Sequence, residues 1–205
     1  MIQVPRCATI DKEVQEKLDK IATDKRHVRW NGKAKAVKSF KAEALKHGLS
    51  IQDHRCAWCM LEVGERGRRT AHRDHIAPKG RYPAWTFLPK NIVVSCEYCN
   101  GFLVKGETDT VMTSAADYDH CDFRLVHPYL DKPTEHISFY GDDDADGVLL
   151  RAVTDKGRWT IDLFRLDSGF ATANRAKDKL FERLMLKLGE KDRVRFVEAL
   201  KSIGA

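Results

Sequence analysis

The chain has 205 residues, a hydrophobic fraction of 42%, a charged fraction of 32% and a formal net charge of +6 at pH 7. This length allows one medium-sized domain or a small domain with extensions. No stretch approaches the roughly 18 consecutive apolar residues of a membrane-spanning helix, and the N-terminus lacks the apolar region of a signal peptide. We therefore expect a cytoplasmic protein with no membrane partner.

The first 52 residues are predicted to form a basic helical arm. Apolar residues recur at helical spacing over 9–24, and the Ala- and Lys-rich segment 33–47 is predicted to be a second helix that ends at Gly48. The run from Lys25 to Lys41 has seven Lys or Arg and no acidic residue. It is either a solvated helix face or a surface for a polyanion, whose contacts would then include Lys33, Lys35 and Lys38.

Residues 53–106 contain two Cys-x-x-Cys pairs, Cys56 with Cys59 and Cys96 with Cys99. Each pair places two sulfurs within reach of one tetrahedral ion, and two pairs complete a closed four-cysteine site. The alternatives are buried thiols or redox-active pairs, and neither pair lies in the βαβ pattern that redox pairs favour. We predict a structural Zn²⁺ whose binding is coupled to folding.

Polar residues of a second kind lie between and just after these pairs: Asp74, His75, Asn91 and Asn100. A histidine can take a proton from water near neutral pH, and carboxylate and amide oxygens suit a hard divalent ion. Asp74 and Asn100 would supply the oxygens and His75 the base, which indicates phosphodiester hydrolysis. The alternative is a surface Asp-His pair with two unrelated polar turn residues.

The position of the Asp-His pair raises a geometric question. Neighbours on a regular strand point to opposite faces, so Asp74 and His75 share a site only where the strand ends or bulges. If the strand stays regular, His72 faces the same way as Asp74 and becomes a substitute ligand. His72 could equally be a structural residue or a phosphate contact.

Basic and aromatic residues surround the motif in sequence. Basic side chains there suit phosphate contacts, which would position a nucleic acid. The predicted contacts are Arg73, Lys79, Arg81 and Lys105. Trp58, Tyr82 and Trp85 could stack on bases, whereas Trp58 and Trp85 could instead cover the cysteine knuckle.

The remaining elements give an α+β fold. Residues 53–106 are expected to hold a hairpin through 68–77, a loop over 78–90, a strand over 91–95 and a helix from about 97. The extension 107–205 is expected to be irregular to 135, with short β-runs over 136–166 around an acidic turn at Asp142–Asp146. Two helices, 168–188 and 190–203, follow. Their apolar residues are predicted to be core, with a partner-binding groove as the alternative.

The motif order resembles the HNH, or ββα-metal, endonuclease family in its zinc-stabilised branch. The resemblance rests on Asp-His-Ile-x-Pro at 74–78, Asn-Ile-Val at 91–93 and Cys-x-x-Cys-Asn at 96–100, followed by Lys105 and Gly106. It covers residues 53–106. It implies that His75 is the general base, that Asp74 and Asn100 hold a catalytic Mg²⁺ or Mn²⁺, and that Asn91 supports the loop.

A looser likeness links the extension to the HNH nucleases of Septu-type bacterial defence systems, which pair with an ATPase. It rests on residues 127–137 and 161–166. We therefore expect a metal-dependent endonuclease acting on duplex DNA in an antiphage defence complex. The alternatives are a zinc-dependent nucleic-acid-binding module and a nuclease subunit that is inactive without its partner.

Overall fold

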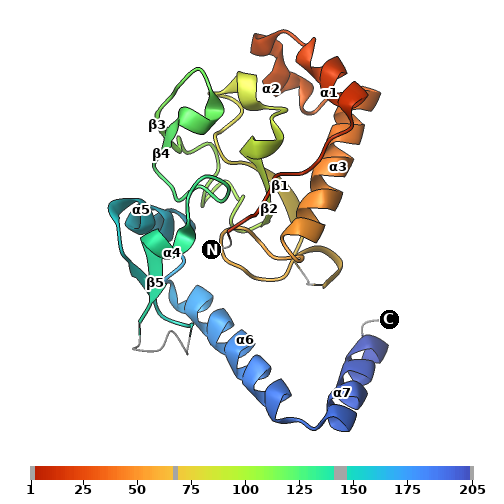
Figure 1. Ribbon diagram of the computed structural model, residues 1–205, viewed down its shortest axis with the longest axis vertical. Coiled ribbons are helices and arrows are strands. Elements are labelled where there is room, and N and C mark those ends of the chain that lie inside the picture. Colours follow the sequence, from red (N-terminus) through yellow and green to blue (C-terminus); the bar gives the residue numbers. More distant parts are fainter. Residues whose placement is uncertain (1–2, 67–68, 141–146, 204–205) are drawn as a thin grey trace.

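A computed structural model describes residues 3–66, 69–140 and 147–203 (Figure 1). Over these residues the protein is α+β, with helices and three two-stranded antiparallel sheets. None of the described helices is both long and apolar enough to span a membrane. The acidic cluster Asp142–Asp146, expected to form a solvated turn, lies outside the described residues.

The N-terminal region contains three helices. They are α1 (Lys12–Asp19), α2 (Arg26–Arg29, after a 3-10 turn at Thr23–Lys25) and α3 (Lys35–Ile51). The Asp11 side chain caps α1 by accepting a hydrogen bond from the Val14 N–H at 3.1 Å, so this helix is shorter than the predicted 9–24. Helix α3 was predicted to end at Gly48, and it continues to Ile51.

Gly48 has a packing role in place of the predicted capping role. A Cβ at this position would lie 2.7 Å from Cγ2 of Val94, so only glycine lets α3 approach the strand so closely. The side chain of Gln52, just beyond α3, donates to the Val94 carbonyl and accepts from the Val94 N–H, both at 2.8 Å. The end of α3 is thereby fixed to the central strand pair.

The three N-terminal helices pack on the strand pair through a shared apolar cluster. Its buried members are Leu18, Trp30, Val37, Phe40, Ala44, Phe87 and Ile92. Phe87 and Ile92 belong to the segment after the first strand, so the cluster joins distant parts of the chain. In Figure 1, α3 runs alongside both strands of the pair, which its residues contact. This packing brings Trp30 to the site described below.

The central strands are β1 (Ala71–His75) and β2 (Ile92–Cys96). They pair antiparallel without a bulge, from Ala71 opposite Cys96 to His75 opposite Ile92. Every residue of β2 is buried, which explains why its sequence is apolar without polar alternation. The strand lies close to its predicted position at 91–95.

The helix predicted from residue 97 is absent from the described structure, and the chain forms successive turns over 97–107. The Gly101 and Val104 amides donate to carbonyls only three residues back, at 3.0 Å. Gly106 has a positive φ of 47°, which reverses the chain. Gly101 and Gly106 therefore favour tight turns over a regular helix in this segment.

The C-terminal extension contains more structure than predicted. Its elements are β3 (Val111–Thr113), β4 (Asp122–Phe123), α4 (Pro133–His136), β5 (Ile137–Phe139), β6 (Leu150–Ala152) and α5 (Asp155–Phe164). Strands β3 and β4 pair, as do β5 and β6. The segment 107–135 therefore contains a short hairpin and a helical turn, where we expected irregular structure.

Helix α5 corrects the prediction of a β-run at 159–166. The Thr154 hydroxyl accepts from the Gly157 N–H at 3.2 Å and begins the helix. A Cβ on Gly157 would clash with the His136 carbonyl, so this glycine lets α5 pack on α4. The buried residues Gly157, Ile161 and Phe164 recur every three or four positions, which is a helical pattern that the alternating residues at 159–163 obscured.

The last two helices lie close to their predicted ranges, but their apolar faces do not form core. They are α6 (Gly169–Lys187) and α7 (Glu190–Ile203), and they project from the rest of the protein (Figure 1). Leu180 and Leu184 are 59% and 52% exposed. The rings of Phe181 and Phe196 lie 6.0 Å apart and join the two helices.

Candidate metal centre and nuclease site

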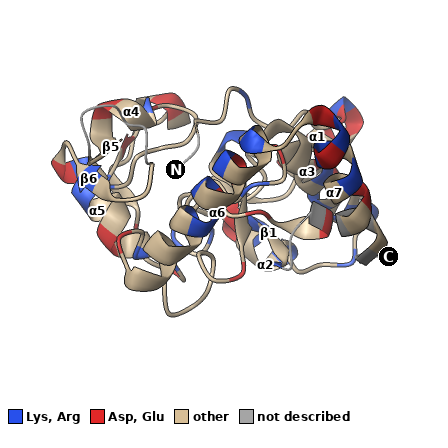
Figure 2. Ribbon diagram, turned by 90° about the horizontal axis from the view of Figure 1, so that it is seen from below, with Lys and Arg blue, Asp and Glu red and all other residues tan. Residues whose placement is uncertain are grey.

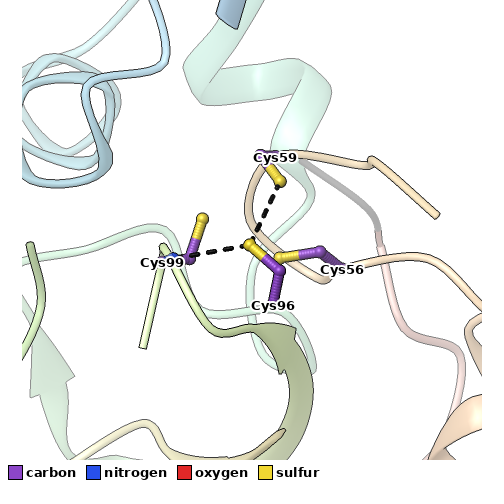
Figure 3. Close-up of side chains that lie close together, drawn as sticks. All are labelled: Cys56, Cys59, Cys96 and Cys99. Atoms are coloured by element: carbon purple, nitrogen blue, oxygen red, sulfur yellow. Dashed lines mark hydrogen bonds between the residues drawn. The ribbon is translucent and has the colours of Figure 1, made fainter. Parts of the chain in front are cut away.

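Four cysteine sulfurs converge where the ends of the core segment meet (Figure 3). Cys56 and Cys59 lie in the turn after α3, Cys96 is the last residue of β2, and Cys99 lies in the next turn. All four Sγ atoms lie within 4.8 Å of one another. A tetrahedral Zn²⁺ with Zn–S bonds of about 2.3 Å places its sulfurs about 3.8 Å apart. The sulfurs of Cys59 and Cys96 lie 3.8 Å apart, which matches this spacing.

The four thiols have unequal tendencies to ionise. Hydrogen bonds from the neighbouring thiols, that of Cys56 above all, lower the pKa of Cys96, whereas burial raises the pKa of Cys56. The Cys99 N–H also donates to the Cys96 sulfur at 3.4 Å. Since zinc binds thiolates, loading this centre would release the protons of the cysteine thiols. The donor set and spacing fit the predicted structural Zn²⁺.

The cysteine knuckle is linked to the second site by Trp58. Its side chain is fully buried, and its indole ring stacks on Phe164 with centroids 4.4 Å apart. Its Nε1–H donates to Oδ2 of Asp74 at 2.7 Å. Trp58 is therefore not available for base stacking. Its side chain connects the cysteine knuckle to Asp74.

Asp74 is buried, with 1% of its surface exposed, and its charge is matched inside the protein. Its second oxygen, Oδ1, accepts from the Lys105 ammonium at 2.8 Å. Lys105 is only 2% exposed and also donates to the His75 carbonyl at 2.5 Å. Lys105 was predicted to contact phosphate, and in this structure its ammonium is buried against Asp74, the predicted metal ligand.

His75 is held as a neutral imidazole in one orientation. Its Nε2 lies 3.0 Å from the Thr86 carbonyl, which can only accept, so the proton is on Nε2 and the lone pair on Nδ1. Trp30 packs edge-on against the ring, with centroids 4.4 Å apart. Burial lowers the pKa of His75 to about 3, aided by the charges of Lys79, Lys105 and Lys41 and opposed by the bond to Thr86.

Asn100 contacts His72. Its side-chain amide nitrogen lies 3.2 Å from Nδ1 of His72. An amide nitrogen can only donate, so Nδ1 of His72 accepts this hydrogen bond and the Asn100 Oδ1 can accept from, or coordinate, another group. Because the pairing of β1 is regular, Asp74 and His75 leave the strand on opposite sides, and His72 shares the Asp74 side. This is the arrangement in which we expected His72 to approach the site.

A pocket of about 300 Å³ nevertheless joins the predicted catalytic residues, because β1 ends at His75 and the turn at 97–107 folds over it. Asp74, His75 and Asn100 all line it. The other lining residues are Trp30, Arg73, Pro78, Lys79, Phe102, Lys105, Gly106 and Glu107. Three cations against two acids give the pocket a positive balance, which favours an anionic ligand.

The other predicted nucleic-acid contacts lie outside this pocket. The Arg81 guanidinium pairs with Asp109 at 3.0 Å. Lys33, Lys35 and Lys38 are exposed at the start of α3 and just before it. Tyr82 and Trp85 stack on each other with centroids 4.8 Å apart.

Asn91 lies behind the pocket, in a buried hydrogen-bond network. Its Oδ1 accepts from the Ala77 N–H at 2.7 Å, and its amide donates to the Ala77 and Trp85 carbonyls at 3.1 Å. These bonds close the loop that follows His75. The Tyr118 hydroxyl donates to the same Oδ1 at 2.9 Å, which fixes the orientation of the amide.

Tyr118 is in turn held by His127. The His127 Nδ1 accepts from the backbone N–H groups of Tyr129 and Leu130, so its Nε2–H donates to the Tyr118 oxygen at 2.9 Å. Burial lowers the pKa of His127 to about 3, so it is neutral. No sequence pattern pointed to Tyr118. His127 lacks the sequence spacing of a metal ligand, which favours the structural role that it has here.

Comparison with known proteins gives distant similarity. No model of a known protein family matches the chain. Over 119 residues the chain is 24% identical to the Septu protein PtuB of Bacillus thuringiensis, which covers 58% of this chain and 39% of that protein. It is 36% identical over 84 residues to protein ea31 of Escherichia phage lambda, covering 41% of this chain and 24% of that protein. The matches thus span less than half of either relative.

Proposed function

We propose that the protein is a metal-dependent endonuclease of the HNH type that hydrolyses phosphodiester bonds in DNA. The observation that supports this proposal is the convergence of Asp74, His75 and Asn100 on one positively charged pocket. The four-cysteine centre includes Cys99, the neighbour of Asn100, and so fixes the turn that carries Asn100 next to the end of β2. The distant similarity to a Septu protein supports the same direction.

His75 would act as the general base. Its Nδ1 has the lone pair, and the Thr86 carbonyl holds the ring through Nε2, so the imidazole is oriented before substrate binds. A pKa of about 3 is low for this task. Burial is the main cause of this low pKa, and the negative charge of a bound phosphodiester would offset the smaller part that Lys79, Lys105 and Lys41 contribute.

Asp74 and Asn100 would hold the divalent ion, Mg²⁺ or Mn²⁺. Both line the pocket, and their carboxylate and amide oxygens are the donors that these hard ions prefer. When bound, such an ion would stabilise charge on the phosphoryl group and the leaving oxygen. Asn91, supported by Tyr118 and His127, would hold the loop after His75 in place.

Arg73 and Lys79 line the pocket and would contact the phosphates nearest the cleaved bond. The exposed Lys33, Lys35 and Lys38 would extend the contact along a duplex, and Arg81 would follow if it leaves Asp109. Because phosphate contacts carry no sequence information, the site by itself would cleave with little sequence preference.

We also propose a role in antiphage defence in the cytoplasm, with an ATPase as partner. The name of the similar Bacillus thuringiensis protein refers to the Septu system, and our sequence comparison with Septu-type nucleases carries the expectation of an ATPase. If this proposal is right, adding the partner ATPase should increase or unmask cleavage by the purified chain.

A second candidate is a nucleic-acid-binding module without catalysis. The observation in its favour is that the Asp74 carboxylate is already paired with Lys105. Such a module would bind DNA with the affinity of the full site and leave it intact under every metal condition.

Cleavage of supercoiled plasmid tests these candidates. The zinc-loaded protein is compared in Mg²⁺, Mn²⁺ and EDTA, with His75→Ala as the test variant and the exposed His120→Ala as the matched control. We expect metal-dependent nicking that His75→Ala abolishes and His120→Ala keeps. Nicking that persists in His75→Ala would refute the role of His75. DNA binding without nicking, even after the partner ATPase is added, would favour the nucleic-acid-binding module.

A further inference from the structure

Lys105 occupies an oxygen-lined position at the centre of the proposed nuclease site. Its ammonium contacts Oδ1 of Asp74 at 2.8 Å and the backbone carbonyl of His75 at 2.5 Å. A carboxylate oxygen together with a carbonyl oxygen is also a donor set that a hard divalent cation would choose. The positive charge beside Asp74 is thus supplied by the chain itself.

The pairing also explains how the buried carboxylate is tolerated. Asp74 and Lys105 are 1% and 2% exposed, and an unpaired charge at such burial is strongly unfavourable. Trp58 donates to the other carboxylate oxygen, so Asp74 is satisfied on both sides. The charge of Asp74 is therefore balanced before any divalent ion binds.

The surroundings of Lys105 give its side chain somewhere to move. It lies on the turn at 97–107, where Phe102 and Leu103 are 88% and 81% exposed. Lys105 also lines the pocket of about 300 Å³. Glu107 lines the same pocket and offers a carboxylate with which the Lys105 ammonium could pair, as that of Lys79 does at 3.8 Å.

We infer that Lys105 is a built-in cation that a divalent ion must displace from Asp74 in order to bind. This inference rests on the proposed function, because it concerns the ion of that site. Displacement would move the ammonium into the pocket beside Arg73 and Lys79, where a phosphate would meet it. Ion entry and phosphate binding would then assist each other, and the ion would bind weakly without DNA.

The consequence can be measured without any cleavage assay. Removing the Lys105 charge should leave Asp74 without a competitor for the ion, so Lys105→Met should bind Mn²⁺ at least about tenfold more tightly than the unaltered protein. Lys79→Met is the matched control, since Lys79 lines the same pocket without contacting Asp74. The double variant Asp74→Asn/Lys105→Met should lose the gain.

The experiment is Mn²⁺ titration of the full zinc-loaded chain, followed by electron paramagnetic resonance of free Mn²⁺, with thermal melting of each variant with and without Mn²⁺. We expect tighter binding and a larger Mn²⁺-induced rise in melting temperature for Lys105→Met than for Lys79→Met. Equal affinities in these two variants would overturn the inference. The inference would also be overturned if Lys105→Met stays unfolded in Mn²⁺ while the double variant folds, because Mn²⁺ would then fail to replace the ammonium beside Asp74.

The outcomes separate this inference from the proposed function. Tight Mn²⁺ binding by Lys105→Met with no cleavage by any form of the protein would support the built-in cation and count against the nuclease. Metal-dependent cleavage by the unaltered protein, with no gain of affinity in Lys105→Met, would support the nuclease and refute the displacement of Lys105.

Discussion

The four-cysteine centre and the Asp74 pocket lie at the ends of the same two strands, yet they balance charge in opposite ways. In the cysteine centre, thiolate charge would be balanced by an ion from outside the chain. In the pocket, the charge of Asp74 is balanced by Lys105 from within the chain. From this difference we expect the first centre to need its metal to fold, and the second to fold without a metal and bind an ion later.

The largest expected effect comes from breaking the cysteine centre. Cys99→Ser should abolish zinc binding and unfold the core, because structural zinc contributes on the order of 10 kcal/mol in small zinc domains. Zinc content by mass spectrometry and far-ultraviolet circular dichroism measure this. The partly exposed Cys7→Ser is the control and should keep one zinc ion. A folded, zinc-loaded Cys99→Ser would contradict the assignment.

The next effect comes from unbalancing the pocket while leaving the zinc centre intact. Asp74→Ala should lower the free energy of unfolding by about 3–5 kcal/mol, because it leaves the buried Lys105 ammonium unpaired. Urea denaturation of zinc-loaded protein measures this loss. Zinc content should not change. Asp74→Asn/Lys105→Met should be more stable than Asp74→Asn alone, and the reverse order would show that the pair is not coupled.

A third effect is the pH dependence of stability that the buried histidines of the pocket and its supporting network should cause. The pKa of His127 is about 3 in the folded protein and about 6.5 when unfolded, so the unfolded chain binds more protons between these values. Stability should therefore fall as pH decreases from about 6.5 toward 3, by up to about 1.4 kcal/mol per pH unit for each such histidine. His75 should contribute in the same way.

The measurement is the free energy of unfolding between pH 7 and pH 5 for the unaltered protein, His127→Gln and the control His120→Gln. The cysteine centre also weakens in acid, so the informative quantity is the difference in slope between variants. We expect a shallower slope only in His127→Gln, since His120 is 78% exposed. Identical slopes in all three proteins would refute the buried neutral state of His127.

The smallest effect tests the support behind the pocket. Tyr118→Phe removes the hydrogen bond donated to Asn91 and the one accepted from His127, and should lower the free energy of unfolding by about 1–3 kcal/mol, without loss of zinc. Under the proposed function it should also slow cleavage, because the loop after His75 is held less firmly. Tyr140→Phe, at an exposed residue, is the control. A change in zinc content would show that the two centres are not separate.

Some structural features could be predicted because they depend on short spacings. The meeting of the two Cys-x-x-Cys pairs at one site could be predicted, since each pair is a single turn that offers two sulfurs to the same ion. Helices α6 and α7 follow from their periodicity and the Gly189 break. The helix predicted from residue 97 and the β-run predicted at 159–166 were wrong, because glycines at 101, 106 and 157 act through turns and close packing that periodicity does not reveal.

The amino-acid sequence by itself determined the α+β class, the four-cysteine centre and the set of polar residues around Asp74 and His75. Only the tertiary structure decided how those residues are held. It paired Asp74 with Lys105, fixed His75 on Thr86 and supported Asn91 through Tyr118 and His127. These contacts join residues 9 to 31 positions apart in an order that no local pattern encodes, because burial and hydrogen bonding select partners by position in space.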